Sequence, residues 1–523
     1  MKIRSDIVKV YKDVHIWVGI FSGLMLFIAF YAGAITMFQK PLARWATPPS
    51  TLATPPPIER TQALIEATLA AHPQAAKRYS IVLETTPEQP ARLIWREGGR
   101  RDAREYGASF DAAGRLQVAE LTQAPVAGLV DRLHQFVGLP FPERIARPIM
   151  GTVAMLYALA LVSGLIVLLP TLVKDLFALR IGRNIKRMWL DAHNALGLVS
   201  LPLHLVMALT SVVFAFHDQF YDVQGKALYG QPISWPRESP TPLPPGARPL
   251  PLPVLLQRVG EQLPHLRVQS LNFGQDHGRV EGSVVGQDIR YGTRARTFSS
   301  THVDPYSGEV DPHDMPGYMD GWSAAVNAFF MLHFGSFGGN AVRWLYFLLG
   351  LTGAALFYTG NLLWIESRRR KARGGEAPAQ KTSARVLGAL TIGVSLGCVA
   401  GISATTAATK WLPGRVHDLA AWHEGIYFAV FAAAVAWTLW RGAARGAHEL
   451  LLATAAVTSL VPLGSLAGIW GVAGTWNHGG AGIVIDLTAL AAVPALLLIA
   501  RHTGRRMHTG HTDSIWSAAA VPR

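Results

Sequence analysis

Cysteine is almost missing from this chain: Cys398 is the only one among its 523 residues. A single thiol excludes an intrachain disulfide, a cysteine-held iron–sulfur cluster and the CxxCH motif that attaches haem covalently. The glycine fingerprints GxGxxG and GxxxxGK(S/T) are absent, so no nucleotide-binding motif is visible. No Ser-His-Asp or HExxH arrangement is identifiable either. Any redox chemistry must therefore use a cofactor held by other side chains.

Charged residues are scarce, at 16% of the chain, whereas hydrophobic residues make up 50%. This balance indicates an integral membrane protein. The formal net charge is +14, but the basic residues cluster beside apolar runs, where positive charge marks the cytoplasmic side. We therefore expect a lipid bilayer as a partner and no nucleic acid. The two clusters are Lys174, Arg180, Arg183, Lys186 and Arg187, and Arg368, Arg369, Arg370, Lys371, Arg373, Lys381 and Arg385.

Eight apolar runs are long enough to cross a bilayer. An even number of spans and the position of the basic loops put both termini in the cytoplasm and two large loops outside. We therefore expect a multi-pass membrane protein with both large loops outside. The predicted spans are Val14–Phe38, Gly151–Val173, Trp189–His217, Trp344–Ile365 and about 386–409, 419–440, 450–473 and 480–500.

The two outside segments show the same order of predicted elements. Residues 58–72 and 253–264 read as helices, and each is followed by short runs with strand composition and a turn near the end. The fold class expected is an α-helical integral membrane protein of about eight transmembrane helices with two periplasmic α+β domains. Its parts are a first span (1–39), a first outside domain (40–150), spans two and three (151–217), a second outside domain (218–340), a fourth span (341–366), a basic loop (367–385), four further spans (386–500) and a tail (501–523).

The first four spans divide into two copies of one plan. Each copy begins with a DxHxxxG motif, DVHIWVG at His15 and DAHNALG at His193. After its outside domain, each copy has a Leu-His pair before the return span, LHQFVG at His134 and LHFGSFGG at His333. Because both copies run outward and then inward, the repeat is parallel, with an axis along the membrane normal. We expect His15 to meet His193 near the cytoplasmic face, and His134 to meet His333 near the outer face.

Histidines inside apolar spans are functional hypotheses by default, because an imidazole at bilayer depth needs a partner. Imidazole suits iron, so each pair is a candidate bis-histidine haem site. The third span also contains His204, roughly three helical turns beyond His193. A second assignment therefore competes with the first: His204 supplies a ligand to the outer haem in place of one of the Leu-His histidines. His217, at the outer end of the span, reads as a solvated residue.

The repeated DxHxxxG span, outside α+β domain, Leu-His segment and return span resemble the PepSY-associated transmembrane family over roughly residues 10–370. That family includes bacterial inner-membrane reductases that release iron from ferric siderophores. The resemblance implies a location in the bacterial inner membrane, PepSY-like outside domains in the periplasm, b-type haem and electron flow toward the periplasm. Carried over by motif, its ligand histidines are His15, His134, His193 and His333, with His204 less secure. Residues 386–500 lie beyond this core and have no assigned purpose.

The function expected is therefore a di-haem b oxidoreductase, a haem-dependent ferric reductase. Electrons from an unidentified external donor enter at the His15/His193 haem, pass to the His134/His333 haem and reduce a periplasmic ferric chelate. Two haem b groups are expected. The alternatives are a non-redox, membrane-anchored periplasmic binding or regulatory protein, and a transporter. A reducible haem spectrum separates the first function from the other two.

Overall fold

The computed structural model describes residues 4–52, 55, 57–86, 90–98, 104–121, 124–172, 184–230, 243, 246–276, 279–292, 300–371, 379–511 and 513–518. The chain forms two compact units. The first, here called the membrane unit, contains residues 1–46, 124–220 and 344–523, and the second, the sheet unit, contains residues 47–123 and 221–343. Four of the basic residues named above, Lys174, Arg180, Arg183 and Arg373, lie outside the described residues.

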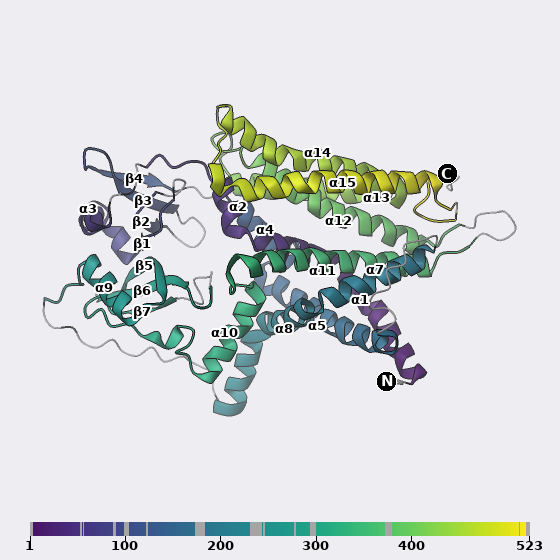
Figure 1. The fold of residues 1–523 in the computed structure, drawn as a ribbon, viewed down its shortest axis with the longest axis horizontal. Coiled ribbons are helices and arrows are strands. Elements are labelled where there is room, and N and C mark those ends of the chain that lie inside the picture. Colours follow the sequence, from purple (N-terminus) through teal and green to yellow (C-terminus); the bar gives the residue numbers. More distant parts are fainter. Residues whose placement is uncertain are drawn as a thin grey trace. The chain divides into compact units, whose positions relative to one another are not determined.

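Among the described residues, eight helices are long and apolar enough to cross a membrane, as the hydropathy predicts. Each is close to the length that a bilayer requires. In Figure 1 the long helices of the membrane unit run roughly side by side. They are α1 (Ser5–Thr36), α5 (Glu143–Leu168), α8 (Leu201–Gln224), α11 (Gly339–Ser367), α12 (Thr382–Ala408), α13 (Leu419–Arg441), α14 (Ala443–Ile469) and α15 (Ile483–Thr509).

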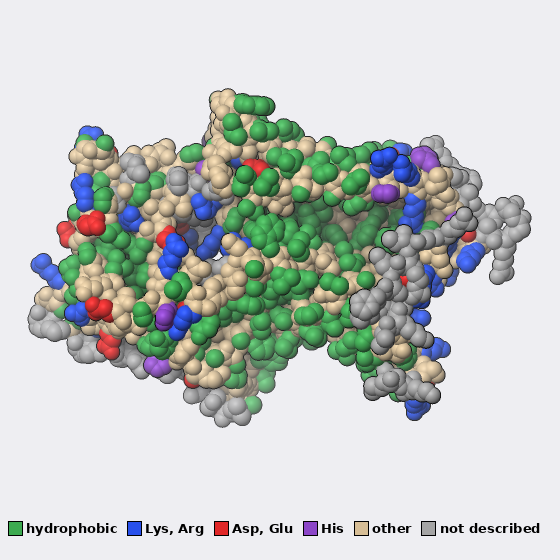
Figure 2. Space-filling model, viewed as in Figure 1, with side chains coloured by type: hydrophobic (Ala, Val, Ile, Leu, Met, Phe, Trp, Pro, Cys, Tyr) green, Lys and Arg blue, Asp and Glu red, His purple; other side chains and the backbone are tan. Residues whose placement is uncertain are grey.

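The surface of the membrane unit is apolar along its length and basic at one end (Figure 2). Large side chains such as Leu490 and Leu498 on α15 are 57% and 56% exposed, which suits contact with lipid. The end at which α1 begins and α11 and α15 end contains Arg368, Arg441 and Arg505. We call it the basic end.

The third predicted span is wrong as one continuous helix. Helix α7 (Ile185–Val199) ends just before Ser200, and α8 begins at Leu201. Pro202 explains the break, because proline has no N–H to donate and its ring clashes with the carbonyl of the residue four positions earlier. The interruption lies between His193 and His204, so these residues do not share the register of one helix.

The Leu-His segments form short helices of their own ahead of the return spans. His134 lies in the last turn of α4 (Val126–Phe136), and His333 lies in the last turn of α10 (Gly321–Phe334). Both helices end in a left-handed residue, Val137 with φ 50° and Gly335 with φ 53°. Helix α4 and the short helix α2 (Gln39–Ala46) share a hydrophobic core with α1.

Helices α12 and α13 pack closely through small residues. A Cβ added at Gly393 would lie 2.8 Å from the Cα of Val435, and one at Gly397 would lie 3.2 Å from the carbonyl oxygen of Phe431. Small residues at such spacing let the backbones of membrane helices approach. The contact holds Cys398 fully buried.

The sheet unit contains one seven-stranded antiparallel sheet in the order β4-β3-β2-β1-β5-β6-β7. Helices α3 (Thr61–Ala71) and α9 (Leu252–Gln262) contribute Leu64 and Leu255 to one core with the side chains of a single sheet face. The strands are β1 (Arg78–Val82), β2 (Leu93–Glu97), β3 (Arg104–Phe110), β4 (Leu116–Glu120), β5 (Leu266–Asp276), β6 (Arg279–Asp288) and β7 (Ser300–Val303).

The two outside segments, expected as two domains, share this one sheet. Strand β1 of the first segment pairs with β5 of the second over five residues, with Tyr79 opposite Phe273 and Ile81 opposite Leu271. An unpaired β1 or β5 would expose a row of backbone donors and acceptors, and the pairing removes both edges. The internal repeat therefore continues into the sheet, with its two copies meeting at the central strand pair.

Candidate functional site

The structure brings together the two DxHxxxG histidines inside the membrane unit. The ring centres of His15, from α1, and His193, from α7, are 6.1 Å apart, and the ring planes are inclined by 68°. Both histidines lie toward the basic end. The separate helices α1 and α7 therefore deliver two imidazoles to one place, as the internal repeat leads one to expect.

Each of these imidazoles is oriented by a backbone carbonyl of the return helix in its own repeat copy. His15 Nδ1 lies 2.8 Å from the carbonyl oxygen of Ala160 on α5. His193 Nδ1 lies 3.2 Å from the carbonyl oxygen of Leu356 on α11. Because a carbonyl only accepts, Nδ1 carries the proton and donates in both cases. This leaves Nε2 with its lone pair, which is how metal-binding histidines are usually held by their second hydrogen bond.

A glycine four residues after each accepting carbonyl makes room for the ring. A Cβ at Gly164, four residues after Ala160, would lie 2.8 Å from His15 Cε1. A Cβ at Gly360, four residues after Leu356, would lie 3.3 Å from His193 Cε1. Any other residue at Gly164 would displace the imidazole. We call these two positions the cradle glycines.

The separation of the two rings matches two axial ligands of one metal. Bonds from a metal to an imidazole nitrogen are about 2.0–2.1 Å long, so two imidazoles on opposite sides of one ion have ring centres about 6 Å apart. The observed 6.1 Å agrees with this spacing. Two protein ligands are few for zinc, which takes three or four, but suffice for iron in a porphyrin.

Buried hydrogen-bond donors lie one helical turn from this pair toward the basic end. Trp189 precedes His193 by four residues, and Trp364 follows Gly360 by four. The indole Nε1 of each is buried and has no hydrogen-bond partner among the described residues. Such donors are costly to leave unsatisfied, so this set suits a ligand that carries anionic oxygens, such as the carboxylates of haem.

His134 is held in the same way on another face of α1. Its Nδ1 donates to the carbonyl oxygen of Ala29 at 2.8 Å. Gly33 follows four residues later, and a Cβ there would lie 2.7 Å from His134 Nδ1. His333 belongs to the sheet unit, whereas His134 belongs to the membrane unit. Their pairing as an outer site stays a prediction.

His204 is fully buried among aromatic rings. Its ring centre lies 5.3 Å from that of Phe30, 5.8 Å from that of Tyr157 and 6.0 Å from that of Phe357. The Tyr157 hydroxyl donates to the His204 carbonyl oxygen at 3.1 Å, so it accepts from the Nδ1 of the same residue. His204 Nε2 has no hydrogen-bond partner in the described part of the chain. A role as an iron ligand, the competing assignment, stays a prediction.

His448 shows the same geometry and is absent from the motifs found in the sequence. This residue of α14 donates from Nδ1 to the carbonyl oxygen of Ala500 on α15 at 3.0 Å, and a Cβ at Gly504 would lie 2.9 Å from its Cε1. Sequence reasoning missed it because α14 belongs to no repeat copy. The sequence does not reveal which backbone carbonyl will accept a hydrogen bond from a histidine. A glycine four residues after that carbonyl therefore cannot be recognised from the sequence alone.

A buried charge pair at the opposite end of the last four spans was also not predicted. Lys410, 1% exposed, donates to Ser465 Oγ at 2.7 Å and to the Trp476 carbonyl oxygen at 3.0 Å. Asp486 Oδ1 accepts from the same Ser465 hydroxyl at 2.9 Å and from Trp45 Nε1 at 3.1 Å. Ser465 therefore bridges the cation and the carboxylate, and Trp45 ties the pair to α2.

The model of the PepSY-associated TM region matches residues 13–367, which is 355 of the 523 residues. The chain belongs to this family. The match includes His15, His134, His193 and His333 and ends before α12, so the last four helices are an addition to the family region. No curated protein matches the chain. This PepSY-family protein is thus a multi-pass membrane protein with eight candidate spans.

Proposed function

We propose that this PepSY-family protein is a di-haem b oxidoreductase of the bacterial inner membrane that passes electrons outward to a ferric chelate. One observation carries the proposal: the ring centres of His15 and His193 lie 6.1 Å apart. Each imidazole donates a hydrogen bond from Nδ1 to a backbone carbonyl, and a cradle glycine leaves space for its ring. His448 has the same carbonyl and glycine arrangement, so it is the meeting of two such rings that supports the proposal.

The inner site, at His15 and His193, contains residues that would hold a haem. His15 and His193 would hold the haem iron, and the donors of Trp189 and Trp364 would be available to its carboxylates. When bound, haem b supplies an iron that takes up and releases one electron. The surrounding residues hold the imidazole tautomer, orient the two rings and keep the site among apolar helices.

The outer site rests on His134 with His333, and on His204 in the competing assignment. His134 has the carbonyl and glycine arrangement of the inner pair. The buried Tyr157 and His204 and the partly buried Phe30 and Phe357 form an aromatic cluster within the membrane unit, which limits water in its interior. Electrons entering at the inner site would leave through the outer one.

The direction of electron flow follows from the charge distribution. The basic end of the membrane unit belongs in the cytoplasm by the positive-inside rule. The sheet unit then lies in the periplasm, where PepSY-like modules would meet the ferric chelate. Reduction to Fe(II) loosens the hold of hard oxygen ligands, because Fe(II) is softer and less charged than Fe(III). The donor is an external reductant on the cytoplasmic side.

The test is the spectrum and haem content of the purified full-length protein. We expect a reducible b-type spectrum and two haems per chain. His193→Ala should remove one haem and leave the other, whereas His217→Ala, a matched control in the same segment, should leave both. Colourless, folded protein made with ample haem would overturn the proposal and favour the binding, regulatory or transport alternatives.

A further inference from the structure

Helix α15, which lies outside the family region, brings a cation to the inner histidine pair. The guanidinium carbon of Arg506 lies 5.9 Å from the ring centre of Trp189. Trp189 is one turn, about 5.4 Å along α7, from His193. Arg506 therefore enters the site from a part of the chain that the four-span family core does not contain.

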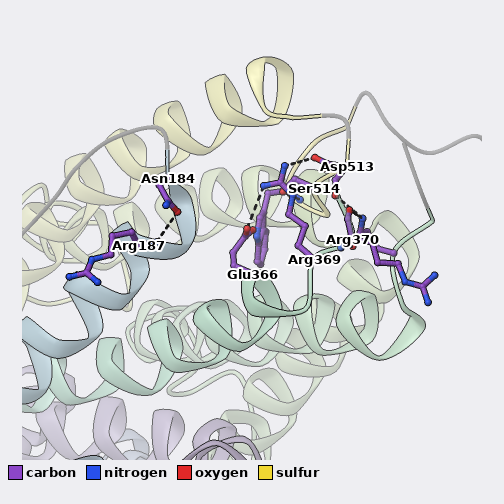
Figure 3. Close-up of polar contacts among 9 residues, drawn as sticks. Asn184, Arg187, Glu366, Arg369, Arg370, Asp513 and Ser514 are labelled. Atoms are coloured by element: carbon purple, nitrogen blue, oxygen red, sulfur yellow. Dashed lines mark hydrogen bonds and ion pairs between the residues drawn. The ribbon is translucent and has the colours of Figure 1, made fainter. Parts of the chain in front are cut away.

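Arg506 has an unsatisfied hydrogen-bond donor. Its Nη2 is buried and has no partner among the described residues. The nearby carboxylates are shared with Arg369, which lies 3.6 Å from Glu366 and also pairs with Asp513. Figure 3 shows Arg369 between these two acids at the end of α11. Burying an arginine nitrogen with no acceptor is unfavourable.

Arg506 Nη2 on α15 and Trp189 Nε1 on α7 are therefore unpartnered donors on neighbouring side chains, one turn from His193. A third unpartnered donor, Trp364 Nε1, lies on α11 one turn from Gly360. Two are neutral and one is cationic. Arginine pairs best with a carboxylate or phosphate. Each of the three groups requires a hydrogen-bond acceptor, and an anionic oxygen of a bound ligand would also neutralise Arg506.

The position of α15 is fixed at both of its ends. Near its start, Asp486 accepts from Trp45 and Ser465 beside buried Lys410. Beyond its end, Asp513 pairs with Arg369 and its carbonyl accepts from Gln380 Nε2 at 2.8 Å. Arg506 is thus presented by an anchored helix.

We propose that Arg506 pairs with a carboxylate of the ligand held by His15 and His193, so that the C-terminal four helices complete this site. The inference rests on the proposed haem function. A cation that neutralises a haem carboxylate favours the reduced, less positive iron. The added helices would then set the reduction potential of the inner haem and leave the outer haem unaffected.

The test is redox titration of the haem spectrum in full-length Arg506→Gln. We expect both haems to be retained and one of the two midpoint potentials to fall, with Arg506→Lys closer to the wild-type protein. Arg505→Gln is the matched control, because Arg505 is its exposed neighbour on the same turn. Unchanged potentials for both haems in Arg506→Gln would overturn the inference, while two bound haems would leave the proposed function standing.

Two further measurements keep the test decisive. If Arg506→Gln does not accumulate, Trp364→Phe, which removes one donor and keeps the ring, should lower the same potential by a smaller amount. The titrations are repeated in detergent with and without anionic lipid. A drop that appears only with anionic lipid would assign Arg506 to a lipid headgroup and overturn the carboxylate pairing. Wild-type protein without haem would instead sink the proposed function itself.

Discussion

The first four spans and the last four use glycine in different ways. In α5 and α11, Gly164 and Gly360 face the imidazoles of His15 and His193. In α12, Gly393 and Gly397 face the backbone of α13. The first arrangement makes space for rings that leave a nitrogen available, and the second brings two helices into contact. The number of glycines in a helix therefore does not show whether they serve ligand binding or helix packing. The group that faces each glycine does show this.

The last four spans also contain the buried charge pair, and removing one partner should have the largest effect on stability. Asp486→Ala leaves Lys410 charged and without its counter-ion. Breaking a buried pair in this way typically costs about 3–5 kcal/mol. We expect a clear drop in the thermal unfolding midpoint in detergent. The double variant Lys410→Met with Asp486→Leu should recover most of the lost thermal stability. An Asp486→Ala variant as stable as the wild type would show that the pair does not stabilise the fold.

The same lysine predicts a pH dependence. Burial lowers the pKa of Lys410 to about 8, with Asp486 opposing the shift. An unfolded lysine titrates near 10.4, so between these values the unfolded chain binds a proton that the folded chain has lost. Stability should therefore rise with pH across this window, by up to about 3 kcal/mol. Unfolding midpoints at pH 8 and pH 10 test this, and Lys410→Met should lack the increment.

The two uses of glycine can be separated by the same substitution in each half. Gly164→Val and Gly397→Val both overfill a contact, at a typical cost of about 1–3 kcal/mol. Gly164→Val should also remove one haem by displacing His15, whereas Gly397→Val should leave the haem content of folded protein intact. Haem-to-protein ratios of the folded fraction are the measurement. Equal haem content in the two variants would contradict the cradle role of Gly164.

The smallest effect is expected from alanine at the looser cradle. A Cβ at Gly360 would lie 3.3 Å from His193 Cε1, so the ring must yield by only a few tenths of an ångström. We expect Gly360→Ala to retain both haems with a small change in one reduced-state band. Gly19→Ala on α1 is the control, because no atom lies within 4 Å of its added Cβ. A larger change in Gly19→Ala than in Gly360→Ala would count against the site.

Local patterns were sufficient for much of the fold. Hydropathy predicted eight spans, and the described part of the chain has eight helices of the required length. The turn expected near the end of the first outside segment lies between β3 and β4. The repeated DxHxxxG motif predicted that His15 and His193 meet, because two copies of one plan place matching residues at matching depths. Their role as ligands stays a prediction.

Other features depended on contacts that no local pattern encodes. The third span reads as one apolar run, but Pro202 interrupts it and changes the relation of His193 to His204. The two outside segments read as separate domains, but β1 pairs with β5 across nearly two hundred positions of sequence. Propensity and hydropathy describe one segment and its surroundings. They do not specify which strand will pair with the exposed edge of another strand.

By itself the sequence determined the membrane class, the eight spans and the repeated histidines, since each follows from residue type and spacing within a short window. Only the tertiary structure decided which carbonyl orients each imidazole, which glycine clears it, and that Arg506 of α15 faces Trp189 of α7. Those contacts join helices that are distant along the chain. They are selected by the packing of the whole bundle, where a buried donor is stable only if the fold supplies an acceptor.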